Sequence, residues 1–171
     1  LYEDTLGPPL GGAMSPDEWL RRLGGLPLRY PPGERFHYSH ATEVLGYKVA
    51  RIEGKPLGQV LKDRIFTPLG MDDTDFWCPP EKRGRMAKLY RANPGSDSLQ
   101  DVSFPHFDNQ PSLEPGGGGL ISSADDYLKF ARMMLGKGEV DGVRLLKAST
   151  VEIMTQNRLT ETQRQIPFMG I

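Results

Sequence analysis

The stretch 29–46, RYPPGERFHYSHATEVLG, places a rigid turn, a short aromatic segment and a helix start in close succession. Two prolines and a glycine at 31–33 predict the turn, because proline fixes φ and glycine admits positive φ. We expect 35–38 to run extended as a short strand, and from 41 onward apolar residues recur at helical spacing. A strand-to-helix corner holds its side chains at a fixed point on a rigid base. The candidate functional residues at this corner are Tyr38, Ser39 and His40.

Two further helices are predicted in the first half of the chain. Ser15, with Glu18 three residues on, predicts a capping box for a short packing helix that ends at Gly24-Gly25. The helix that begins near residue 41 stops at Gly54, and the next one opens at Pro56 and closes by Gly70. We interpret these helices as scaffold.

The second half of the chain has three local signals. Ser122 and Ser123 predict the N-terminal cap of a helix whose early aspartates suit its positive end. Asp141-Gly142, between GEV and VRLL, predicts a hairpin turn. Ser149 and Glu152 predict a capping box for one more helix.

A long irregular segment, 92–119, separates the two halves. Its prolines, together with Asn93-Pro94-Gly95, disfavour long regular elements, and a loop of this length in a compact domain is usually functional or mobile. It ends in four glycines, Gly116–Gly119, without the spacing of a phosphate-binding loop. Four glycines do provide a backbone that can approach another surface closely.

Composition excludes several classes of partner. Charge is balanced, with 21 basic and 22 acidic residues, so nothing points to nucleic acid or an anionic membrane surface. No apolar run reaches the ~20 residues that span a bilayer. A single cysteine, Cys78, excludes an internal disulfide and leaves both cytoplasm and periplasm open; we expect it to be a buried bystander.

A metal or cofactor site is not expected. Asp72, Asp73 and Asp75 lie close together, but this run lacks the glycine and terminal glutamate that shape a calcium loop. A solvated acidic turn is the favoured interpretation.

A family resemblance rests on three ordered stretches. PPGERFHYSHATEVLG, followed by GKPLGQVLKDRIFTPLGMDDTDF, resembles the serine hydrolases of the class C β-lactamase, penicillin-binding-protein and esterase family. The pattern is most similar to the esterase branch, in which a Pro-Gly turn leads into a Tyr-Ser-x triplet and later to a phrase close to Pro-Leu-Gly-Met-x-x-Thr. GGGGLISSADDYLKFARMMLGKGEVDGVRLL is also similar to the family. Together these stretches cover about 30–156.

The resemblance implies an α+β fold of the β-lactamase/transpeptidase type. We expect residues 1–171 to form a single partial domain, a helix-rich fragment that lacks most of the antiparallel sheet. The apolar run 166–171 and the first residue, Leu1, are consistent with an internal piece of a longer protein. The implied position of 92–119 is at the border of the substrate cleft. Class C enzymes can carry a bulky substrate-facing side chain near Gly118, so its absence here is expected to widen the cleft.

The resemblance also implies a mechanism. In this family a Ser-x-x-Lys motif supplies the nucleophile and a proton acceptor, and the tyrosine of the Tyr-Ser-x triplet shares the role of base. Tyr38 matches this tyrosine, and His40 stands where the penicillin-binding branch prefers asparagine. Ser39, His40, Gly117 and Gly118 are the expected substrate contacts, and the expected substrate is a small ester or amide.

The other catalytic motifs of the family are missing from these residues. No Ser-x-x-Lys, Lys-Thr-Gly, His-x-Gly or Trp-Gly-Gly occurs in the 171 residues. One hypothesis is therefore a serine hydrolase in which this stretch supplies Tyr38 and has no turnover alone. The alternative is a non-catalytic binding or interaction module, in which Tyr38 is a packing residue. The sequence sets no oligomeric state.

Overall fold

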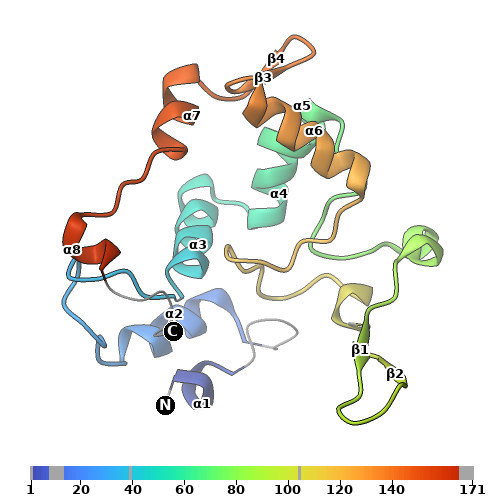
Figure 1. Cartoon of the computed structure of the whole chain (residues 1–171), viewed down its shortest axis with the longest axis horizontal. Helices are drawn as coiled ribbons and strands as arrows, with labels where there is room; N and C mark the ends of the chain where they lie inside the picture. The colour runs from blue at the N-terminus through green and yellow to red at the C-terminus, as the bar shows by residue number, and fades with distance from the viewer. Residues whose placement is uncertain (1, 8–13, 39, 104, 166–171) are drawn as a thin grey trace.

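The computed structural model describes residues 2–7, 14–38, 40–103 and 105–165, and Figure 1 shows their arrangement. The helices are α1 (Tyr2–Leu6), α2 (Pro16–Gly24), α3 (Ala41–Glu53), α4 (Leu57–Leu61), α5 (Thr67–Leu69), α6 (Ala124–Leu135), α7 (Ala148–Met154) and α8 (Glu161–Arg164). The strands are β1 (Tyr90–Ala92), β2 (Leu99–Asp101), β3 (Glu139–Val140) and β4 (Val143–Arg144). They form two separate two-stranded antiparallel sheets, β1-β2 and β3-β4. The predicted helix-rich α+β class is confirmed.

The N-terminal half packs around one aromatic core. Leu6, Trp19, Tyr47 and Leu113 form a buried cluster that joins α1, α2 and α3 to the end of the long loop. The Trp19 and Tyr47 rings meet edge to face, with centroids 5.2 Å apart. This packing fixes the orientation of α3, the helix that follows the Tyr-Ser-x triplet.

A second core lies beneath α6. Phe66, Leu69, Met71 and Met133 are buried together, and α6 runs alongside α4 and α5 in Figure 1. A π-helical segment, Lys62–Phe66, joins α4 to α5, so the expected helix runs on through Pro68 to Gly70.

Three of the local predictions are confirmed. The Ser15 hydroxyl accepts a hydrogen bond from the Glu18 backbone N–H at 3.3 Å, and the Ser123 side chain caps α6 in the same way. Asp141 and Gly142 both have positive φ, 48° and 81°, and form the turn between β3 and β4. Positive φ at both central residues matches the twist of the flanking strands.

The carboxylate of Glu18 does not complete the expected capping box. It accepts hydrogen bonds from Arg21 and Arg22, each at 2.7 Å, and the bond from Arg21 is the main reason that its pKa falls to about 2. The expected burial of Cys78 is confirmed.

Two expectations are corrected. Residues 35–38 form no strand, because no neighbouring strand pairs with them among the described residues. The cap of α7 is Lys147 rather than Ser149, and Glu152 pairs with Lys137 instead, at 3.1 Å. Within the segment 92–119 the regular elements are short, as in the β1-β2 hairpin, where Tyr90 pairs with Asp101.

None of the described helices is both long enough and apolar enough to cross a membrane.

Candidate active site at the start of helix α3

Tyr38 lies just ahead of α3, two residues before the N-cap position at His40. Its side chain is 58% exposed, while the helix that follows is anchored in the aromatic core. Tyr38 is therefore an exposed residue that directly precedes an anchored part of the fold. Ser39 lies outside the described residues.

His40 is held by aromatic packing. Its ring stacks on Tyr2, with centroids 6.0 Å apart and planes 14° apart, and meets the edge of Trp19 at 5.7 Å. The half-buried imidazole makes no capping hydrogen bond to α3. These contacts hold His40, two residues after Tyr38, and a substrate contact by His40 stays a prediction.

The run Gly116–Gly119, called the glycine loop below, lies against the first two turns of α3 (Figure 1). A Cβ on Gly46, inside α3, would lie 2.7 Å from the Cα of Gly116, and a Cβ on Gly117 would lie 2.9 Å from the carboxyl carbon of Glu43. Real Cβ atoms essentially never approach so closely, and at Gly46 the nearest atoms belong to the backbone, so glycine is required there. At Gly117 the nearest atoms are the far end of the Glu43 side chain, which can move aside. The sequence thus brings Gly117 next to the turn of α3 that follows the triplet.

Gly118 differs from its neighbours. A Cβ at this position would meet no atom within 4 Å, and its φ lies outside the left-handed region. Neither packing nor backbone conformation therefore requires glycine at 118. Its contact with substrate, like that of Gly117, stays a prediction.

Two buried oxygen atoms belong to residues one helical turn apart on α3. Glu43 Oε2 and the Tyr47 hydroxyl are both buried, and neither has a hydrogen-bond partner within the described part of the chain. Burial is the main cause that raises the pKa of Tyr47 well above its usual value, and the negative charge of Glu43 adds to it.

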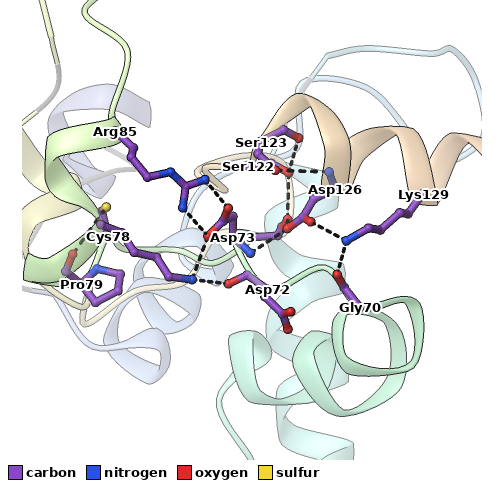
Figure 2. Close-up of polar contacts among 12 residues, drawn as sticks. Gly70, Asp72, Asp73, Cys78, Pro79, Arg85, Ser122, Ser123, Asp126 and Lys129 are labelled. Atoms are coloured by element: carbon purple, nitrogen blue, oxygen red, sulfur yellow. Dashed lines mark hydrogen bonds and ion pairs between the residues drawn. The ribbon is translucent and has the colours of Figure 1, made fainter.

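A separate polar cluster links α6 to the turn after α5, as Figure 2 shows. Asp126 is 4% exposed, and its carboxylate accepts hydrogen bonds from the Asp73 N–H at 2.7 Å and the Thr74 hydroxyl at 3.0 Å. Its other oxygen pairs with Lys129 at 3.1 Å, and Lys129 also donates to the Gly70 carbonyl. The sequence indicates only that Asp126 complements the dipole of α6. It does not predict that Asp126 links α6 to the turn after α5.

The carboxylate of Asp73 is held by two cations on the other side of the same turn. Arg85 and Lys82 both form ion pairs with it, and the hydrogen bond from Arg85 is the main reason that the pKa of Asp73 lies far below its usual value. A cavity of about 620 Å³ opens here, and Asp73, Trp77 and Ser122 are among its lining residues. Tyr38, His40, Gly117 and Gly118, the predicted site residues that the structure describes, are not among its lining residues.

Glu114 anchors the start of the glycine loop. Its buried carboxylate accepts a hydrogen bond from the Gly58 N–H at 2.7 Å, in the first turn of α4, where Pro56 supplies no side-chain cap. The partners are 56 residues apart in sequence, and no local pattern marks Glu114 as a cap.

Comparisons with known proteins agree on one family. A family model described as Beta-lactamase matches residues 1–169. Protein Rv1367c of Mycobacterium tuberculosis is 46% identical over 92% of this chain, and esterase EstB of Burkholderia gladioli is 34% identical over 66%. The unliganded selenomethionyl structure of simvastatin synthase (LovD) from Aspergillus terreus has a TM-score of 0.67 and 27% identity over 82% of this chain. The chain spans 39%, 32% and 33% of the lengths of these three proteins, respectively.

Proposed function

The chain belongs to the Beta-lactamase family, and on that premise we propose that it forms the tyrosine-bearing wall of a serine hydrolase active site. The observation that carries the proposal is the position of Tyr38. Its exposed side chain stands at the start of an anchored helix, whose next turns contact the glycine loop.

The proposed reaction proceeds through an acyl-enzyme. A serine outside these 171 residues attacks the substrate carbonyl and loses its proton to a base shared by Tyr38 and a lysine. The adduct then expels the alcohol, which takes up this proton, and leaves the acyl group on the serine. Water, deprotonated by the same base, attacks the acyl-enzyme, and the acid leaves as the serine regains its proton. A tyrosinate forms near neutral pH only beside a cation, since its ordinary pKa is about 10, and the lysine supplies this charge. The chemistry needs no metal and no cofactor.

The proposed substrate is a small carboxylic ester, with amides including β-lactams as the competing class. One similar protein is named an esterase and another a simvastatin synthase, and both names favour acyl transfer. Open space around Gly118 supports a wide cleft, in which Ser39, His40, Gly117 and Gly118 contact the substrate.

The test combines intact mass with burst kinetics. The longer protein that contains this chain, and the 171-residue chain alone, are mixed with a chromogenic short-chain ester and a chromogenic cephalosporin. We expect an ester burst only from the longer protein, and its loss on Tyr38→Phe with folding intact by circular dichroism. If neither substrate acylates the longer protein, or if the Tyr38→Phe variant keeps the full burst, the hydrolase proposal fails. The absence of Ser-x-x-Lys would then favour the binding-module alternative.

A further inference from the structure

The chain reaches Tyr38 through a stiff turn at residues 31–34. The Glu34 N–H closes this turn by donating to the Pro31 carbonyl at 3.2 Å. Two successive prolines restrict φ within it, and Gly33 has a φ of 83°, which a residue with a side chain rarely adopts. Because the turn is stiff, a contact that holds one of its atoms restrains the turn as a whole.

Several contacts hold the residues between this turn and Tyr38. The Arg35 guanidinium carbon lies 4.0 Å from the centroid of the Tyr30 ring, within cation–π distance. The His37 imidazole meets the same ring edge to face at 5.5 Å. Phe36 and Tyr38 take part in interactions as well. Movement of the turn is therefore passed on to Tyr38 through packed residues.

A residue from the other end of the chain contacts this turn. Gln163 of α8 is half-buried, and its side-chain Nε2 donates a hydrogen bond to the Gly33 carbonyl at 2.8 Å. The two partners are 130 residues apart in sequence, and Figure 1 shows α8 beside the segment that leads to α3. This bond, called the clamp below, ties α8 to the turn.

The same amide group also caps α8. Gln163 Oε1 accepts from the Thr160 N–H at 2.9 Å, and the Gln163 N–H donates to the Thr160 hydroxyl at 3.3 Å, which completes a capping box. A backbone N–H can only donate and a carbonyl can only accept, so cap and clamp form together in one orientation of the amide. Glutamate suits this position of a capping box as well as glutamine does. The donor used in the clamp is what glutamine adds.

We propose that Gln163 is a positioning residue for Tyr38 and that it acts by clamping the turn 31–34 to α8. The inference rests on the proposed role of Tyr38 as a base. A base must lie within hydrogen-bond reach of the proton that it takes. Loss of the clamp therefore slows the reaction more than it weakens substrate binding.

The kinetic test removes the two halves of the amide one at a time in the longer protein. Gln163→Glu keeps the acceptor for Thr160 and loses the donor to Gly33, whereas Gln163→Lys keeps a donor and loses the acceptor. We expect Gln163→Glu to lower kcat about three- to tenfold with little change in KM, as loss of one hydrogen bond implies. Gln163→Lys should keep most of kcat. The reverse ranking would show that only the cap matters and would overturn the inference.

Two further variants separate hydrogen bonding from charge and from the cap. Gln163→Met is uncharged and lacks both donor and acceptor, so it should lower kcat as much as Gln163→Glu does. Thr160→Val removes the hydroxyl of the cap and leaves the Gln163 amide, so kcat should stay within about twofold of the wild type. Circular dichroism checks the fold of each variant. Equal losses of kcat in Thr160→Val and Gln163→Met would overturn the inference.

A structural readout separates this inference from the proposed function. Hydrogen–deuterium exchange of a peptide that spans residues 29–38 should be faster in Gln163→Glu than in the wild type, and unchanged in Gln163→Lys. Equal exchange in the wild type and Gln163→Glu overturns the inference even if Tyr38→Phe abolishes activity. Faster exchange in Gln163→Glu together with full activity of Tyr38→Phe supports the clamp and rejects the catalytic role of Tyr38.

Discussion

Gly46 of α3 and Gly116 of the glycine loop cross with their backbones in contact, so that a Cβ on Gly116 would lie 2.8 Å from the Gly46 Cα. The crossing holds the loop against the helix that begins after Tyr38. It explains why a glycine stands inside a helix, where it otherwise costs stability relative to alanine.

The first prediction compares two glycines of the same loop. Gly116→Ala forces the loop away from α3 and should lower the free energy of unfolding by about 1–3 kcal/mol, as overpacking does. Gly118→Ala meets open space and should change it by less than about 0.5 kcal/mol. Urea unfolding measures both, and equal losses would mean that the crossing is not tightly packed.

The second prediction concerns the link between α6 and the turn after α5. Asp126→Ala leaves the Asp73 N–H and the Thr74 hydroxyl without their buried acceptor, and should cost about 3 kcal/mol. Asp125→Ala, in the same helical turn but exposed, is the matched control and should cost less than about 1 kcal/mol. A similar loss in both variants would show that only the helix dipole matters.

The third prediction follows from the depressed pKa of Asp73. A carboxyl whose pKa is lower in the folded state contributes stability above its unfolded pKa of about 3.9, and this contribution is lost as pH falls toward the folded value. Stability should therefore fall with acid below about pH 4, and Asp73→Asn should flatten this slope. Asp72→Asn is the control, and an unchanged slope in Asp73→Asn would contradict the expected linkage.

The fourth prediction concerns Tyr47 at alkaline pH. Its pKa is raised in the folded state, so the folded protein holds this proton more tightly, and stability should fall as pH rises above the ordinary tyrosine value of about 10. Glu43→Gln removes the smaller cause, so the pKa of Tyr47 should fall yet stay above its usual value. Ultraviolet titration of tyrosinate, with Tyr47→Phe to assign the signal, measures this shift, and no change would exclude Glu43 as a contributor.

Local patterns predicted local structure well. Ser15 and Ser123 cap helices, and Asp141-Gly142 forms a turn, through contacts with residues only a few positions away. The sequence next to each of them is therefore enough to predict its structure. The strand expected at 35–38 failed because an extended segment becomes a strand only with a partner, and alternation of side chains does not supply one.

Long-range polar contacts could not be predicted in the same way. Glu114 and Asp126 bind backbone groups 56 and 53 residues away, and an acidic residue beside a glycine run or in a first helical turn has an ordinary local explanation. The site residues were placed by resemblance to a family. The contacts of Arg35 and His37 with the Tyr30 ring could not be predicted either, because they exist only once the turn brings these residues together.

The glycine loop also bears on how such a protein can diversify. Where one side of a binding site is main chain packed against a helix, most single substitutions lower the stability of the fold and so are lost before they can change substrate binding. At 116 an added methyl group collides with the backbone of α3, at 117 it meets only the end of the Glu43 side chain, and at 118 it meets no atom. Variation in substrate range that arises within this loop should therefore accumulate at 118, while 116 stays under purifying selection.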